Sequence, residues 1–110
     1  MAYTAVLERL KEERRKLEEV IRQLEDQKKE IDKNYESILQ EERKLYDQLR
    51  TCRDTYQYSR LEMRLSMMAN TRREWEAKKE EIDRKLRGYR EELAKILRRI
   101  EYLKPKTQRG

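Results

Sequence analysis

The sequence predicts an all-α protein in which two long helices form an antiparallel coiled-coil hairpin. Charged residues make up 47% of the 110 residues, and apolar residues recur every three or four positions along most of the chain. With 35% hydrophobic residues and no Phe, the chain cannot fill a compact globular core, but it can line a narrow seam between helices. High charge is also typical of disorder, yet the regular repeat and the near absence of Gly and Pro favour ordered helices.

The first helix is expected at about residues 4–52. If Leu7 occupies position a of a seven-residue repeat and Leu10 position d, all seven d positions up to Cys52 are apolar. Such a helix carries one apolar stripe, which must be buried against another helix. The predicted seam residues of this helix are Leu7, Leu10, Leu17, Ile21, Leu24, Ile31, Tyr35, Ile38, Leu45 and Leu49.

The second helix is expected at about residues 58–104 and follows its own repeat. Pro105 ends it, because proline cannot continue a helix, and residues 105–110 form a polar, basic tail. The coiled-coil hairpin therefore spans residues 1–104. The predicted seam residues of the second helix are Leu61, Leu65, Trp75, Ile82, Leu86, Tyr89, Leu93, Ile96, Ile100 and Leu103.

The two repeats are out of step by two residues. The first repeat would place an a position at Met63, whereas the second places it at Leu65. Continuous coiled coils absorb shifts of three or four residues, so a shift of two favours a chain reversal, with the turn near residues 53–57. The alternative is a single long helix in a parallel coiled-coil dimer.

A hairpin of this kind pairs residues whose numbers sum to 110. Leu10 then faces Ile100, and the charged core residue Glu42 faces Met68. Every charged residue of the seam meets an apolar one in this register. The pairing therefore supports the hairpin over the continuous helix.

The turn carries two alternative helix starts and an apolar surface. Asp54, or Ser59 together with Glu62, could cap the second helix. Aromatic and Met side chains near the turn would form either an adaptable docking tip or part of a capped turn. The candidate tip residues are Tyr56, Tyr58, Met63 and Met67.

Positive charge is concentrated at the C-terminal end. Residues 1–83 carry a net charge of −1 and residues 84–110 a net charge of +7. Most other charges are expected to form solvated pairs with the acid four residues before the base, such as Glu18–Arg22 and Glu91–Lys95. The candidate partner-binding patch consists of Arg84, Lys85, Arg87, Arg90, Lys95, Arg98, Arg99, Lys104, Lys106 and Arg109.

This patch would attract acidic protein surfaces, nucleic acid or anionic lipid. No nucleic-acid-binding motif is recognisable, and the apolar residues that a membrane-surface helix would need are already used by the seam. A protein partner with an acidic surface or a groove for a helix is therefore expected. Nucleic acid bound by the basic end is the alternative.

No catalytic function is predicted. The chain has no His, no Gly-rich phosphate loop and no base beside Cys52, and a two-helix rod offers no deep pocket. No metal or other cofactor is expected, because one Cys without His cannot provide the usual zinc ligands. The lone Cys52, the lack of an apolar run of membrane-spanning length and the lack of a signal-peptide pattern after Met1 predict a cytoplasmic protein.

The expected function is that of a structural or adaptor element that docks into a larger protein assembly. Self-association or docking onto a partner is expected, because each helix buries only one stripe. The two-helix layout and the basic second arm from Trp75 to Leu103 resemble the FliJ/YscO type of export-apparatus protein. That resemblance implies a small antiparallel coiled coil that acts as the central stalk or chaperone escort of a hexameric type III export ATPase.

Overall fold

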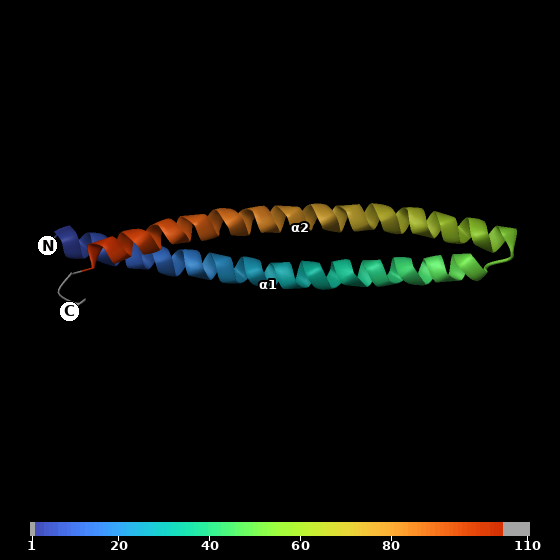
Figure 1. Ribbon diagram of the computed structural model, residues 1–110, viewed down its shortest axis with the longest axis horizontal. Coiled ribbons are helices and arrows are strands. Elements are labelled where there is room, and N and C mark those ends of the chain that lie inside the picture. The colour runs from blue at the N-terminus through green and yellow to red at the C-terminus, as the bar shows by residue number, and fades with distance from the viewer. Residues whose placement is uncertain (1, 105–110) are drawn as a thin grey trace. The chain divides into compact units, whose positions relative to one another are not determined.

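A computed structural model describes residues 2–104, which form two long helices and a short connection. Helix α1 is Ala2–Thr51 and helix α2 is Thr55–Leu103. The two helices run antiparallel and lie in contact (Figure 1). The predicted all-α helical hairpin is confirmed, and the chain does not form one continuous helix. The predicted tail at residues 105–110 lies outside the described residues.

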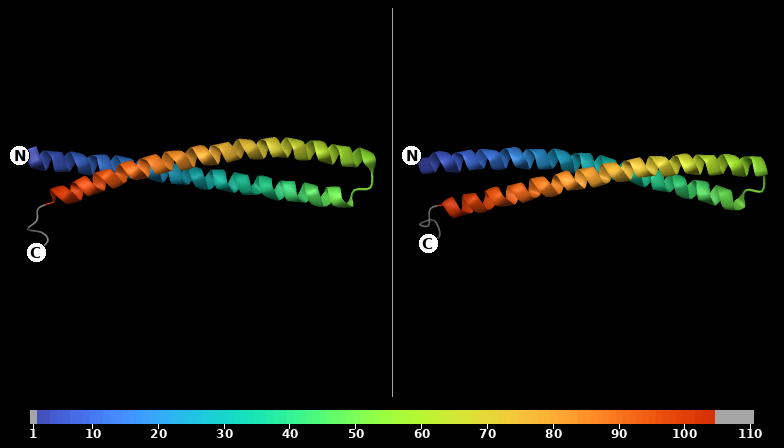
Figure 2. Two further views of the ribbon diagram at one scale, coloured as in Figure 1. Left: turned by 45° about the horizontal axis from the view of Figure 1, so that its top comes forward. Right: turned by 90° about the horizontal axis from the view of Figure 1, so that it is seen from above.

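Residues 52–54 connect the two helices, so the connection is shorter than the turn predicted near residues 53–57. Helix α2 begins earlier than expected because Asp54 caps it. The Asp54 carboxylate oxygen Oδ1 accepts a hydrogen bond from the backbone N–H of Tyr56 at 2.9 Å, and its carbonyl accepts one from the N–H of Tyr58, also at 2.9 Å. This is the pattern of a helix N-cap. Figure 2 shows the connection from two further sides.

The chain divides into two compact units, and each contains a stretch of both helices. The first, here called the terminal unit, contains residues 2–26 of α1 and 83–103 of α2. The second, here called the turn unit, contains residues 27–82. In the described chain, neither helix has a segment that is both long and apolar enough to cross a membrane.

The terminal unit has a core of aliphatic side chains. Leu10, Ile96 and Ile100 form a buried cluster, and Leu7 and Leu103 pack against it. The predicted facing residues Leu10 and Ile100 thus share one cluster, as do Leu7 and Leu103. The side chain of Leu86 is the most deeply buried, at 1% exposure.

The turn unit has a seam in which polar residues interrupt the apolar layers. Leu45 and Leu65 are buried, while Tyr35 and Trp75 are half-buried. The ammonium of Lys79 lies 4.4 Å from the centre of the Tyr35 ring, within the range of a cation–π contact. None of the twenty predicted seam residues is exposed.

The register does not predict one polar contact of the seam. The sequence register placed Glu42 opposite Met68 and gave every charged residue an apolar neighbour, but Glu42 forms an ion pair with Arg72 at 2.9 Å. The two residues belong to successive layers rather than to one layer. The long Arg72 side chain reaches along the seam to the next layer. A register that pairs only directly facing residues does not predict such a contact.

Candidate functional site

Six exposed cations of α2 in the terminal unit have one property in common. None of them forms an ion pair or a hydrogen bond with any other described residue. Lys85 does interact with another residue, and Lys104 pairs with Glu101 at 3.4 Å. Lys106 and Arg109 of the predicted patch lie outside the described residues. The six, here called the unpaired cations, are Arg84, Arg87, Arg90, Lys95, Arg98 and Arg99.

Two arginines of α1 in the same unit behave differently. Arg15 pairs with Glu12 at 2.5 Å, and Arg22 pairs with Glu19 at 2.6 Å and with Asp26 at 3.1 Å. Each pair lies on one helix, three or four residues apart, where side chains are neighbours. Acids of the same helix therefore offset the positive charge of these two α1 arginines.

These hydrogen bonds perturb the proton affinity of the groups involved. The hydrogen bond from Arg15 lowers the pKa of Glu12, and the hydrogen bond from Arg22 lowers the pKa of Glu19. The same contacts raise the pKa of each arginine. Both carboxylates are thus held in the charged form by their own helix.

Among the described residues, the pairs Glu18–Arg22 and Glu91–Lys95, two of those predicted with the acid four residues before the base, do not form. Arg22 is engaged by Glu19 and Asp26, and Glu18 pairs instead with Arg14 at 3.5 Å. Lys95, which the sequence pairs with Glu91, is one of the unpaired cations. The excess positive charge of this unit therefore lies on α2, where a binding partner can contact it.

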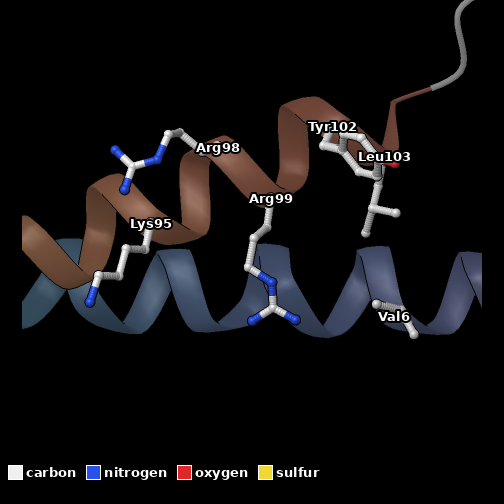
Figure 3. A pocket seen from close by; sticks show the side chains of 6 residues that line it. All are labelled: Val6, Lys95, Arg98, Arg99, Tyr102 and Leu103. Atoms are coloured by element: carbon white, nitrogen blue, oxygen red, sulfur yellow. The ribbon is translucent and has the colours of Figure 1, made fainter.

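Three of the unpaired cations line a groove that has apolar side chains within it. The groove has a volume of about 590 Å³ and opens at the end of α2. Figure 3 shows that Leu103 extends toward α1 near Val6, and that Arg99 also extends toward α1, whereas Arg98 stays on the α2 side. The lining residues are Val6, Lys95, Arg98, Arg99, Tyr102 and Leu103.

Two lining residues were not predicted from the sequence. Val6 directly precedes the a position Leu7, and Tyr102, which is 86% exposed, directly precedes the d position Leu103. Val6 packs against the buried cluster from beside the seam, whereas Tyr102 lies outside the seam. An apolar residue next to an a or d position at the end of a coiled coil is the signal that could have identified them.

Only three of the four candidate tip residues lie on one face of α2. Tyr56, Met63 and Met67 are about two-thirds exposed and share one face of α2, because they are spaced by seven and four residues. Tyr58 is less exposed and lies on a different face of the helix. The guanidinium of Arg60 lies 5.8 Å from the centre of the Tyr56 ring. The tip is thus an exposed apolar stripe beside a capped turn.

Comparison with known protein families, curated proteins and solved structures gave no match for this chain.

Proposed function

We propose that this chain is a non-enzymatic docking element, a helical hairpin that attaches to a larger protein assembly through α2 of the terminal unit. The clustering of six unpaired cations on one stretch of α2 carries this proposal. A cation that already has an internal partner must give it up, or share it, when it meets an acidic surface. The unpaired cations can meet such a surface without losing an internal ion pair, so complementary charge is fully effective there.

The groove favours a protein partner over nucleic acid. Protein interfaces combine a buried apolar centre with a polar rim, and the groove offers Val6 and Leu103 beside three cations. A phosphate backbone would use the cations but not the aliphatic side chains. The exposed ring of Tyr102 next to Arg98 suits base stacking, so single-stranded nucleic acid is the second candidate ligand.

A stalk of an export ATPase, as the resemblance to FliJ/YscO proteins implies, is a narrower form of the same proposal. It requires the same hairpin and a protein partner at one end. Identification of the partner distinguishes this role from other structural and adaptor roles.

The experiment is a capture of partners from nuclease-treated lysate of the source cells, using the full chain at about physiological ionic strength. A variant that removes four unpaired cations, R84Q/R87Q/K95Q/R98Q, is compared with a matched variant that removes four exposed cations of α1, R9Q/K16Q/K29Q/K33Q. Both changes remove the same charge from the chain. We expect a stoichiometric protein partner that the α2 variant loses and the α1 variant retains.

Two results would contradict the proposal. One is bound material that disappears with nuclease treatment, which would make the basic end a nucleic-acid surface. The other is a protein partner that both variants retain equally, which would show that docking does not use the unpaired cations.

A further inference from the structure

The apolar part of the groove continues the core of the terminal unit. Val6 and Leu103 are half-buried, and both pack against the buried cluster of Leu10, Ile96 and Ile100. The core is therefore not closed at this position, because these two side chains remain partly accessible from the groove. Covering them with a further apolar side chain would be favourable by the same hydrophobic burial that holds the helices together.

The cations along the groove have the spacing of a helix surface. Lys95 is followed by Arg98 three residues later and by Arg99 four residues later, a rise of about 4.5–6 Å along the helix axis. A second helix laid along α2 would present acids at the same spacing of three and four residues. It would place its apolar stripe over Val6 and Leu103, in the manner of a helix bound in a groove.

We infer that the groove formed by Val6, Lys95, Arg98, Arg99, Tyr102 and Leu103 binds an acidic amphipathic α-helix of a partner protein. This inference rests on the proposed function, because it specifies the site and the chemistry of the partner. Apolar side chains of the bound helix contact Val6, Tyr102 and Leu103, and its flanking carboxylates contact the three cations.

Charge argues against two other occupants. The residues that follow α2 in the sequence, 105–110, carry Lys106 and Arg109 and no acid, so the cations of the groove repel them. A second copy of the chain would offer the acids of α1 only in part, because Glu12 and Glu19 already form hydrogen bonds with Arg15 and Arg22. A partner whose acids are free is the better match.

The test uses the full chain labelled for amide NMR and a synthetic probe. The probe is a helical peptide of about 18 residues made of Ala, Leu and Glu, with Leu along one face and Glu on both flanks; this length suffices for a helix. Two control peptides replace Glu by Gln, or Leu by Ser. We expect the probe to shift the amide signals at Val6 and at residues 95–103, and both control peptides to bind at least roughly tenfold more weakly.

Two variants of the chain separate the contributions of charge and apolar contact. K95Q/R98Q/R99Q removes only unpaired cations, and V6T replaces a methyl group by a hydroxyl of similar size. K95Q/R98Q/R99Q is expected to weaken binding of the Leu/Glu probe by roughly tenfold or more, because it removes all three charged contacts. V6T is expected to weaken binding by about threefold, because it alters one of three apolar contacts. The spectrum of each variant without peptide shows whether the helices are retained.

Several outcomes would overturn the inference while leaving the proposed function standing. These are shifts confined to Tyr56, Met63 and Met67, equal binding of the Gln peptide, or unchanged binding by K95Q/R98Q/R99Q.

An oligonucleotide of single-stranded DNA that shifts the groove signals more strongly than the peptide would assign the site to nucleic acid. A dimer in sedimentation that K95Q/R98Q/R99Q dissociates would assign the groove to a second copy. A lysate partner retained by R84Q/R87Q/K95Q/R98Q would instead count against the proposed function.

Discussion

Arg72 and Glu42 form an ion pair across the seam of the turn unit, with the guanidinium Nε 2.9 Å from the carboxylate Oε1. Glu42 is 7% exposed, so the pair lies inside a contact that is otherwise apolar. Arg72 also reaches Glu76 at 3.2 Å, and Glu76 accepts a hydrogen bond from the hydroxyl of Tyr35 at 3.1 Å. These contacts link the two helices through four polar side chains.

Such a pair specifies alignment more than it adds stability. A buried ion pair is often replaceable by apolar residues at little cost, whereas a charge left without its partner is strongly unfavourable. A shift of α2 against α1 would separate Arg72 from Glu42 and leave the carboxylate among apolar side chains. We therefore expect the pair to disfavour other registers of the hairpin.

The first prediction concerns this pair. Arg72→Met leaves the Glu42 carboxylate without its cation and should lower the free energy of unfolding by about 1–3 kcal/mol. The double variant Glu42→Leu/Arg72→Met removes both charges and should cost less than Arg72→Met alone. Urea unfolding of the wild type, the two single variants and the double variant gives the coupling energy.

Arg73→Met is the matched control, because Arg73 is exposed and donates a hydrogen bond to Asn70 of its own helix. It should change the free energy of unfolding by less than about 0.5 kcal/mol. Additive effects of Glu42→Leu and Arg72→Met would show that the two residues are not coupled, contrary to the prediction.

The second prediction concerns pH. The hydrogen bond that Tyr35 donates to Glu76 raises the pKa of its phenol, and burial and the negative charge of Glu76 act in the same direction. A raised folded-state pKa gives stability that is complete below the unfolded-state pKa, at about pH 10. This contribution is lost as the pH rises through the folded-state pKa of Tyr35.

We therefore expect unfolding experiments above about pH 10 to show a loss of stability that Tyr35→Phe reduces. The absorbance of ionised tyrosine, followed during an alkaline titration, should lose its late component in this variant. Tyr46→Phe, which removes an exposed phenol, is the control. If both variants removed the same part of the titration curve, the hydrogen bond to Glu76 would not be the cause of a raised pKa at Tyr35.

The seam was predictable because it depends only on spacing. Leu86 and Ile100 occupy positions of the repeat, and a contact between two helices buries these positions. Their burial therefore follows from the sequence. The pair of Arg72 with Glu42 was not predictable in this way, because the reach of a long side chain selects its partner. The start of α2 was open between Asp54 and Ser59, and only the backbone hydrogen bonds identify Asp54.

The candidate site also has a part that was predictable from the sequence and a part that was not. The excess of basic residues near the C-terminal end is visible in the sequence, but whether each one is paired depends on side-chain conformation. Glu91 precedes Lys95 by four residues, which favours a pair, and no pair forms. The groove was not predicted either, because Val6 and Tyr102 lie next to seam positions rather than at them.

The third prediction concerns the connection. Asp54→Ala removes the carboxylate that accepts the N–H of Tyr56, and it should lower the free energy of unfolding by about 1 kcal/mol. Asp54→Asn keeps a side-chain oxygen at the same place and should cost much less, because Asn is an equally good N-cap residue. Urea unfolding measures both. Equal losses for the two variants would indicate that the charge of Asp54, rather than its hydrogen bond, stabilises the turn.

The fourth prediction concerns Gly88, an exposed residue inside α2. A Cβ built at this position meets no atom within 4 Å, and the backbone there has no positive φ. Gly88→Ala should therefore raise the free energy of unfolding by about 0.5–1 kcal/mol, because alanine loses less backbone entropy than glycine when a helix forms. Thermal and urea unfolding both measure this gain.

Ala77→Gly is the matched control, since Ala77 is also exposed in α2 and its change should lower stability by a similar amount. Gly88 follows Arg84 by four residues and precedes Lys95 by seven, so it lies on the same outer face as these two unpaired cations. A methyl group at Gly88 therefore also reports how closely a partner approaches this face. If Gly88→Ala lowered stability while Ala77→Gly behaved as expected, a surface not present in the single chain must already be packed against Gly88, and self-association would be its first explanation.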